Sequence, residues 1–294
     1  MAKKKQGSGK IAIPFLITTL VSLILIGIPA LYYYNKITLR GEEINGTNKS
    51  QEYAPSASDS GNILVVLDFN DESLVKTFFV LRVEPMTRKF ILVPFLNSTS
   101  LTTDNKTATI NDFYSSGGIV SVKSALENTF DIKINKYIKL EDESFCKLCD
   151  IFGGASYNVP AGLKGFNAGE QYLSSEQIQN LITHYAFADE EQRVYYASGV
   201  ITAMINQTTG ERIAGNLETN FNSVMNLVGE SDIAALDFTA KQKVIEYIFE
   251  EDKYDAQFKN PSGNWEDNMY VLSQDDIAEV KEWLADVSAE ETEE

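Results

Sequence analysis

Short apolar runs separated by turn residues dominate the chain between residues 62 and 95. The run "NILVVLDF" holds five consecutive apolar residues at 63–67, which is typical of a strand covered on both faces. Apolar runs at 77–83 and 90–95 predict two more strands. The sequence Glu84-Pro85-Met86-Thr87 predicts the turn between them, because proline favours the second position of a turn. The folded part of the chain therefore begins with three strands.

Helical spacing of apolar residues is the main pattern further along the chain. In "GGIVSVKSALENTFDI" apolar residues recur every three or four positions, and "KYIKL" then predicts a short strand. Ser174 and Gln177 form a capping box before a helix that reaches about Tyr185. Further helices are predicted at 190–206, 219–228, 239–249 and 274–287, with one strand at 269–272. Alternating strands and helices predict a single α/β/α layered domain with a mixed central sheet, at residues 62–287.

A long uncharged stretch precedes this domain. Between Lys10 and Lys36 lie 25 residues without a charge. As a helix they would measure about 37 Å, more than the ~30 Å hydrocarbon layer of a membrane. We therefore expect a cytoplasmic tail at 1–10, a transmembrane helix at 11–35 and a flexible linker at 36–61 that is rich in Gly, Ser, Asn and Glu. A cleaved signal peptide is the alternative, but the run is too long and Ile28-Pro29-Ala30 is a poor cleavage site.

Charge predicts the orientation of the chain and argues against one class of partner. Lysines at positions 3, 4, 5 and 10 precede the apolar span, so we expect the N-terminus in the cytoplasm and the main domain outside the cell membrane. The chain has 25 basic and 42 acidic side chains, and without those four lysines and Lys36 its net charge is about −22. Such a surface repels nucleic acid, which is therefore not an expected partner. Residues 288–294 form an acidic tail.

Both cysteines of the chain lie in the predicted helix "EDESFCKLCDIFGG". A redox Cys-x-x-Cys pair normally begins a helix, whereas Cys146 and Cys149 lie in the middle of this one, and Cys149 shares its apolar stripe with Phe145 and Phe152. A zinc site would need two more ligands, and His184 is the only histidine. Buried helical cysteines are therefore favoured over a disulfide or redox pair, and both over a metal site.

Several segments of the chain follow one another in an order and at spacings that together are typical of one protein family. The stretch at 110–163 carries Ile-Asn before a Gly-Gly, then "ALENTFDIKINKYIKL", then a helix closed by Phe-Gly-Gly, then Asn-Val-Pro. The segments "NILVVLDF", "FNAGEQYLSSEQIQNLI" and "ETNFNSVMNLVG" belong to the same pattern. In these features the chain resembles the LytR-CpsA-Psr family of bacterial cell-envelope proteins. The resemblance covers most of residues 62–287, and the family's single membrane helix with an outer domain matches the topology expected above.

The resemblance implies a particular chemistry. Members of this family are thought to transfer glycopolymers from a polyprenyl-pyrophosphate carrier onto peptidoglycan, with magnesium. It therefore implies arginines that clamp diphosphate oxygens, a carboxylate that helps to hold the metal, and an apolar pocket for the lipid tail. Asp68 matches the family's acidic residue after the first strand and is the candidate metal ligand.

This chain departs from the family pattern at most of the arginine positions. The departures are Asn70 for an arginine, Lys76 for an aspartate, Leu96-Asn97-Ser98 for Pro-Arg-Asp, and Thr183 and Tyr185 for two later arginines. Asp189 matches an acidic position, and of the following arginines only Arg193 remains. The candidate phosphate or head-group contacts are therefore Arg193, Lys76 and Asn97, and no catalytic residue is assigned.

We expect a degenerate member, a pseudoenzyme that binds an envelope lipid, a glycan or a partner protein without turnover. The alternative is an active magnesium-dependent phosphotransferase with a rearranged site around Lys76, Arg193 and Asp68. A metal loop formed by Asp68, Asn70 and Glu72 lacks the glycine that such loops need. Neither a G-x-S-x-G motif nor a P-loop occurs. Arginines brought to the cleft from elsewhere, such as Arg82, Arg88 or Arg212, would overturn the expectation of inactivity.

Overall fold

The computed structural model describes residues 53–70, 75–184, 186–206, 210–250 and 253–285. Within these ranges no helix has both the length and the apolar character needed to cross a membrane. The transmembrane helix predicted at 11–35 lies outside the described residues, as do the acidic tail and most of the predicted linker.

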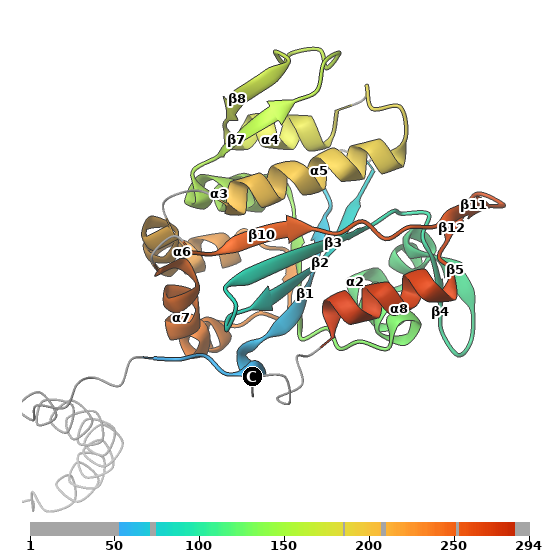
Figure 1. The fold of residues 1–294 in the computed structure, drawn as a ribbon, viewed down its shortest axis with the longest axis horizontal. Helices are drawn as coiled ribbons and strands as arrows, with labels where there is room; N and C mark the ends of the chain where they lie inside the picture. Colours follow the sequence, from blue (N-terminus) through green and yellow to red (C-terminus); the bar gives the residue numbers. More distant parts are fainter. Residues whose placement is uncertain (1–52, 71–74, 185, 207–209, 251–252, 286–294) are drawn as a thin grey trace, which may run out of the picture. The chain divides into compact units, whose positions relative to one another are not determined.

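A six-stranded mixed sheet forms the centre of the domain (Figure 1). In spatial order its strands are β10 (Asp255–Phe258), β3 (Lys89–Phe95), β2 (Thr77–Glu84), β1 (Gly61–Leu67), β6 (Lys136–Leu140) and β9 (Glu230–Ser231). β2 pairs antiparallel with both β1 and β3, whereas β6 is parallel to β1 and β10 is parallel to β3. β1, β3, β6 and β10 therefore run in one direction. We call the edge where these four strands end the carboxyl edge.

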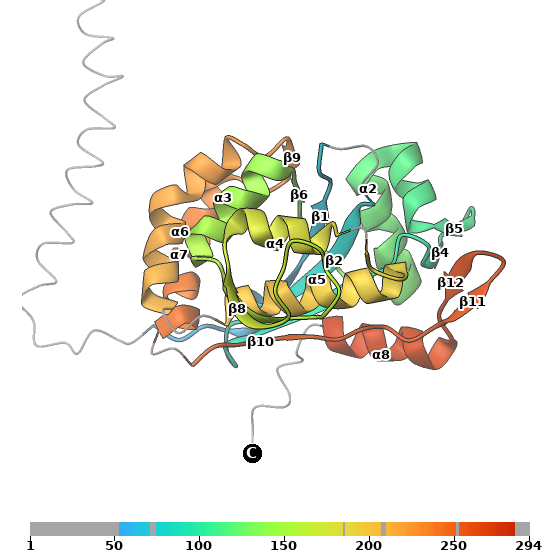
Figure 2. The ribbon, with the colours of Figure 1, turned by 90° about the horizontal axis from the view of Figure 1, so that it is seen from above.

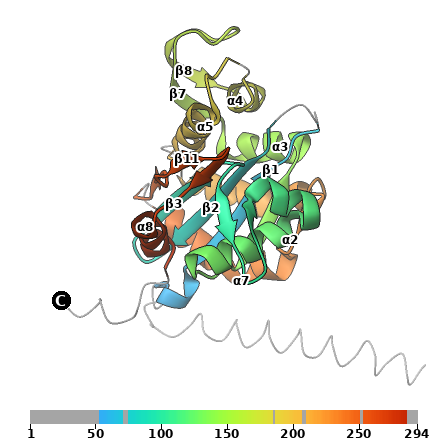
Figure 3. The same ribbon diagram turned by 90° about the vertical axis from the view of Figure 1, so that its right-hand side faces the viewer.

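Helices cover both faces of this sheet (Figures 1 and 3). One face carries α2 (Ile110–Phe130) and α8 (Gln274–Leu284). The other face carries the remaining helices, as Figure 2 shows from above: α3 (Asp142–Phe152), α4 (Ser175–Ile182), α5 (Glu190–Ile205), α6 (Gly210–Met225) and α7 (Ala235–Phe249). The prediction of a mixed α/β domain with a central mixed sheet is confirmed.

The two-sided burial of the strands follows from their sequence. Along β2, Phe78 and Val80 belong to the core cluster under α2 and α8, whereas Phe79 belongs to the cluster under α3, α4 and α5. All three side chains are nearly or fully buried, as a continuous apolar run predicts.

The structure adds three small hairpins that the apolar pattern did not predict in full: β4 (Ser100–Thr102) with β5 (Thr107–Thr109), β7 (Ala155–Val159) with β8 (Gly169–Leu173), and β11 (Asn264–Glu266) with β12 (Met269–Val271). Several helix bounds were also wrong. α4 ends at Ile182 and not near Tyr185, and α6 spans Gly210–Met225 and not 219–228. α7 begins at Ala235 and not at 239, and α8 ends at Leu284 and not at 287.

The helix predicted at 117–132 from its apolar pattern begins earlier in the structure. α2 begins at Ile110, because Thr109 caps it by accepting a hydrogen bond from the Asp112 amide. Gly117 and Gly118 break its regular geometry, and Gly118 has φ 63° and ψ −160°, a backbone conformation that is open essentially to glycine alone. The Gly-Gly pair therefore marks a kink inside α2 and not its start.

The segment before β1 makes contacts with the domain. Asp59, at the end of a short 3-10 helix (Ala57–Asp59), accepts a hydrogen bond from Lys241 of α7 at 2.7 Å. The Tyr53 and Tyr247 rings meet edge to face, with centroids 6.3 Å apart. Part of the segment that composition assigns to the linker, from Tyr53 onward in the described residues, thus contacts the folded domain.

Candidate functional site

The carboxyl edge gathers the residues that follow or precede the strands. Asp68 follows β1, Asn97 lies two residues after β3, Glu141 follows β6, and Lys76 directly precedes β2. In open α/β sheets ligands bind outside the carboxyl ends of the strands. The position of this edge therefore makes it the candidate site.

Asp68 uses both oxygens of its carboxylate within the protein. Its Oδ1 lies 3.2 Å from Nζ of Lys76, and its Oδ2 accepts a 2.7 Å hydrogen bond from the Tyr114 hydroxyl. Lys76 Nζ also lies 5.6 Å from the centre of the Tyr114 ring. Tyr114 comes from the first half of α2. These three side chains therefore form a closed arrangement of acid, cation and phenol.

More charges border this arrangement. Lys139 Nζ lies 2.8 Å from Oε1 of Glu141. Its pKa is raised chiefly by the hydrogen bond to Glu141, against the opposing effect of burial, with further contributions from Asp68 and Glu230. Burial raises the pKa of Tyr114, and its hydrogen bond to Asp68 and the nearby carboxylates of Glu230 and Glu141 raise it further.

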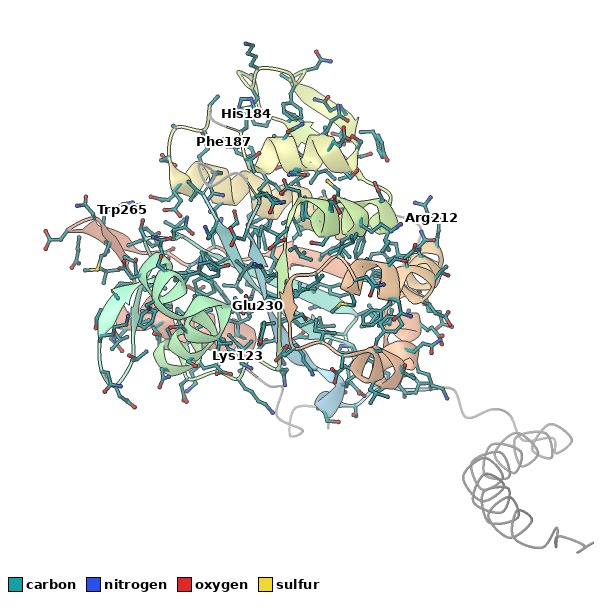
Figure 4. The ribbon with its side chains drawn as sticks, turned by 180° about the vertical axis from the view of Figure 1, so that it is seen from behind. Lys123, His184, Phe187, Arg212, Glu230 and Trp265 are labelled. Atoms are coloured by element: carbon teal, nitrogen blue, oxygen red, sulfur yellow. The ribbon has the colours of Figure 1, made fainter. Side chains whose placement is uncertain are left out.

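We call these six side chains the edge cluster: Asp68, Lys76, Tyr114, Lys139, Glu141 and Glu230. Glu230 lies in β9, beside the kink of α2, where a Cβ on Gly118 would come within 4.0 Å of its Oε1 (Figure 4). With three carboxylates and two ammonium groups, the cluster pairs both of its cations internally and carries a net negative charge.

Arg193 lies at the same edge, in α5, but its guanidinium is turned inward. Nη1 donates to the Thr77 hydroxyl at 2.6 Å and Nη2 to the Lys76 carbonyl at 3.3 Å, and Glu190 lies 3.9 Å away. Only 8% of the residue is exposed, and burial lowers the pKa of its guanidinium. Arg193 thus holds the backbone at the start of β2.

Asn97 contributes its backbone to a contact with α5. Its amide donates to Glu190 Oε1 at 2.5 Å, and the hydroxyl of Ser98 donates to Glu190 Oε2 at 3.2 Å. The Oδ1 atom of Asn97 is buried and has no hydrogen-bond partner among the described residues. The structure thus places all three candidate head-group contacts at one edge, and it engages Lys76 and Arg193 with protein groups.

The other positions of the expected arginine clamp have local structural roles. The Asn70 amide donates to Oδ2 of Asp142 at 2.7 Å, and Leu96 is buried in the core. Thr183 caps the end of α4 through its hydroxyl, which donates to the Gln179 carbonyl at 2.9 Å. Tyr185 lies outside the described residues.

His184 is buried between aromatic rings. Its Nδ1 accepts a hydrogen bond from the Ala186 amide at 3.1 Å, so Nε2 carries the proton that is donated to the Lys164 carbonyl at 3.0 Å. The rings of Phe166 and Phe187 contact it edge to face (Figure 4). These contacts give His184 a structural role.

Among the described residues, the arginines that could replace the missing family arginines do not lie at the carboxyl edge. The chain has five arginines, and Arg40 lies outside the described residues. Arg82 is fully buried near the opposite edge, where it pairs in register with Asn62, the second residue of β1. Arg88 contacts Glu250 and the Tyr247 ring beside the turn between β2 and β3. Arg212 of α6 packs against Gly153, far from Glu230 (Figure 4).

The residues at this edge do not fit a magnesium ion. Both oxygens of Asp68 already have partners, and one of those partners is an ammonium group at the expected position of a second acid. Across the described ranges, no group of three or more His, Cys, Asp or Glu side chains is placed to hold a metal. Glu72, the third member of the metal loop considered above, lies outside those ranges.

The two cysteines are free thiols in α3. Cys149 is fully buried in the core, and this burial raises its pKa. Cys146 is half-buried and donates to Gln179 Oε1 at 3.0 Å, and burial together with nearby acids raises its pKa as well. A reactive redox thiol needs the opposite shift. The interpretation of a buried helical thiol is confirmed for Cys149 and is correct only in part for Cys146.

Sequence reasoning missed four members of the edge cluster: Tyr114, Lys139, Glu141 and Glu230. One partial signal was available, because the strand β6 was predicted, and a strand that pairs parallel with β1 ends beside Asp68. The observed register indeed pairs Leu67 with Leu140, which places Glu141 next to Asp68. Tyr114 and Glu230 come from a helix and a two-residue strand whose positions depend on tertiary packing.

Solved structures of other proteins share this fold at low sequence identity. One is a transcription regulator from Eubacterium siraeum, with TM-score 0.71 and 20% identity over 81% of this chain and 96% of that one. Another is TagV from B. subtilis, with TM-score 0.60 and 17% identity over 76% and 95%. A third is TagT bound to LI-WTA, with TM-score 0.61 and 11% identity over 79% and 92%.

A comparison with curated proteins finds no match. The sequence profile of the LytR_cpsA_psr family, in contrast, matches residues 31–285, which is most of the chain and the whole of the described domain from its first strand to its last helix. This chain therefore belongs to the LytR_cpsA_psr family.

Proposed function

We propose that this protein binds a glycopolymer of the bacterial cell envelope, or its lipid carrier, without transferring it. The observation that carries the proposal is the state of the cations at the carboxyl edge. Lys76 is paired with Asp68, Lys139 is paired with Glu141, and Arg193 is buried against Thr77 and the Lys76 carbonyl. Transfer from a diphosphate carrier needs cations that face the ligand.

Electrostatics argues against a tightly held diphosphate. To bind Lys76, a diphosphate would have to displace Asp68 while it stays close to Glu141 and Glu230. The Lys76–Asp68 pair is partly exposed, so breaking it costs at most about 1 kcal/mol. Repulsion between the diphosphate and the neighbouring carboxylates adds to this cost. Lysine also offers a point charge where arginine offers a planar fork.

The proposed place of action is the outer face of the cell membrane. The uncharged segment at 11–35 would anchor the chain, and the lysines before it would keep its N-terminus in the cytoplasm. A topology reporter fused after residue 60 should be active outside the membrane. A reporter that is active only in the cytoplasm, or full-length chain in the soluble fraction, would contradict this placement.

The activity test uses the full chain in detergent with magnesium and a polyprenyl-diphosphate-linked glycopolymer. We expect retention of the lipid-linked polymer with no transfer to peptidoglycan. The supporting precedent for the ligand is a relative of the same fold that was solved in complex with LI-WTA.

An active transferase with a rearranged site around Lys76, Arg193 and Asp68 is the competing function. It predicts turnover that is lost in Lys76→Met. The Lys76 side chain is 29% exposed, so this variant should fold, whereas loss of activity in an Arg193 variant could report unfolding alone. Turnover by the wild type and its loss in Lys76→Met would overturn the proposed function.

A further inference from the structure

A pocket of about 560 Å³ opens at the carboxyl end of β3 and shares no residue with the edge cluster. Its walls come from the end of β3, from α5, from the segment after β10, and from β12 (Figure 1). The lining that matters here consists of Glu191, Gln192, Tyr195, Asn260, Ser262 and Tyr270. Small-molecule sites have volumes of roughly 300–1,000 Å³ and combine apolar walls with a few polar groups.

The pocket is held in shape by its own contacts. The Tyr270 amide donates to the Ser98 carbonyl at 2.8 Å, which fixes β12 beside the end of β3. The segment after β10 packs tightly on this tyrosine. A Cβ added to Gly263 would lie only 2.8 Å from the Tyr270 ring and from the Val271 carbonyl. A wall built by such close backbone approach is preorganised for a ligand.

Two half-exposed aromatic side chains lie in this region: Tyr195 lines the pocket, and Trp265 contacts Glu191 of the lining. Tyr195 is 49% exposed, although its ring contacts those of Tyr196 and Phe258 at 5.5 and 5.3 Å. Trp265, also 49% exposed, lies in the β11–β12 hairpin with its ring 5.5 Å from that of Tyr270 (Figure 4). Exposed rings that are held in place by their neighbours offer apolar faces to a partner.

The polar groups of the pocket identify the chemistry of that partner. Glu191 is the only charged residue of the lining, and its Oε1 accepts a 2.7 Å hydrogen bond from the Trp265 indole. Gln192, Asn260 and Ser262 add amide and hydroxyl groups. A pocket with a carboxylate and no lysine or arginine disfavours phosphate. Amides, hydroxyls and a carboxylate can instead hydrogen-bond ligand hydroxyls.

We infer that this pocket binds uncharged sugar rings of a glycan, with one ring stacked on Tyr195 and its hydroxyls bound by Glu191, Gln192 and Asn260. The assignment deepens the proposed function, since it names the ligand class of an envelope-binding protein and rests on that function for its biological setting. It places glycan recognition in a pocket whose lining contains no lysine or arginine to hold a diphosphate.

The test titrates the full chain in detergent with two neutral probes, chitotetraose and maltotetraose, by calorimetry and by tryptophan fluorescence. The chain has two tryptophans. Trp283 belongs to α8, where the ammonium group of Lys259 lies over its ring. A fluorescence signal that disappears in Trp265→Phe therefore reports this pocket. We expect binding of at least one probe. Tyr195→Ala should weaken it about tenfold, as expected for the loss of one stacking platform, while Tyr195→Phe should retain it.

Two controls make the assignment falsifiable. Tyr172→Ala removes a tyrosine that is 62% exposed on the distant β7–β8 hairpin, and it should leave affinity unchanged. Glu191→Gln keeps the acceptor for Trp265 and should change affinity for a neutral probe only slightly. Absence of binding for both probes, or equal binding by wild type and Tyr195→Ala, would overturn the assignment. A preference for cationic chitosan oligomers that is lost in Glu191→Gln would overturn the uncharged ligand.

The saccharide titration and the transfer assay fail independently. Saccharide binding together with glycopolymer transfer would contradict the proposed function and leave the pocket assignment intact. Absence of both would contradict the pocket assignment alone.

Discussion

The edge cluster and the pocket lined by Tyr195 both lie at the carboxyl edge of the sheet, and they differ in how their polar groups are used. In the cluster each ammonium group already faces a carboxylate within 3.2 Å. In the pocket, polar groups and the half-exposed ring of Tyr195 line an open volume, and its single carboxylate contacts an indole N–H. The comparison teaches that the place where a fold could bind a ligand and the place where a given chain offers unused binding groups need not coincide.

The strongest test of this contrast removes the buried guanidinium that supports the cluster. Arg193→Met takes donors from the Thr77 hydroxyl and the Lys76 carbonyl, and it should lower the free energy of unfolding by about 3 kcal/mol. Urea denaturation measures the loss. Lys76→Met is the matched control, because its ion pair is partly exposed and should contribute at most about 1 kcal/mol. Equal, small losses would mean that Arg193 is not structural and is available to a ligand.

A second prediction concerns the kink that brings Tyr114 and Glu230 together. Gly118→Ala places a side chain at φ 63° and ψ −160° and should cost about 2 kcal/mol in thermal or urea unfolding. Gly215→Ala is its control, because Gly215 lies in α6 with open space around it and should gain up to about 1 kcal/mol. A neutral Gly118→Ala would show that the kink is not needed.

A third prediction uses Lys76 as the internal cation of the cluster. Added magnesium should leave the melting temperature of the wild type unchanged, because the ammonium group lies where a metal would be held. Lys76→Asp places a second carboxylate beside Asp68 and should create a melting temperature that rises by a few degrees with magnesium. Calcium-free buffers with and without magnesium provide the comparison. Magnesium stabilisation of the wild type would show that the cluster holds a metal after all.

The smallest expected effect is a dependence on alkaline pH. The pKa of Tyr114 is raised in the folded state, so the folded protein holds this proton more tightly than the unfolded chain. The resulting stability is fully present below about pH 10, the ordinary tyrosine pKa, and is lost as pH rises further. Tyr114→Phe should flatten this decline in urea unfolding.

The pH comparison needs a second tyrosine, because others contribute. Burial raises the pKa of Tyr157 to about 12, so Tyr157→Phe should flatten the same decline without touching the cluster. In Asp68→Asn the Tyr114 hydroxyl should ionise at lower pH than in the wild type, as ultraviolet titration can show. An unchanged Tyr114 titration in Asp68→Asn would remove the evidence for their coupling.

The sequence predicted those parts of the fold in which local pattern and tertiary burial agree. The strands β1, β2, β3 and β6 carry apolar runs, and α3 ends at Gly153, which adopts φ 87° as a helix C-terminal glycine commonly does. The strands that were missed, among them β8 ("GEQYL") and β10 ("DAQF"), are polar strands with few apolar residues. Their existence depends on pairing partners that no local pattern reveals.

The candidate site could be predicted in part for the same reason. Thr77 pairs with Leu67, so Lys76 must lie beside Asp68 once the hairpin is formed. The inward orientation of Arg193 could not be predicted, because it depends on how α5 packs on the sheet. The pocket joins segments that are more than sixty residues apart in the chain, such as Tyr195 and Tyr270, and no motif announces it.

The central claim is that the cations of the carboxyl edge are paired with groups of the protein itself. A calorimetric titration of the full chain with inorganic diphosphate, with and without magnesium, tests this claim most directly. The account predicts no binding at millimolar diphosphate in either condition, and the same result for Lys76→Met. Micromolar binding by the wild type that is lost in Lys76→Met would contradict it.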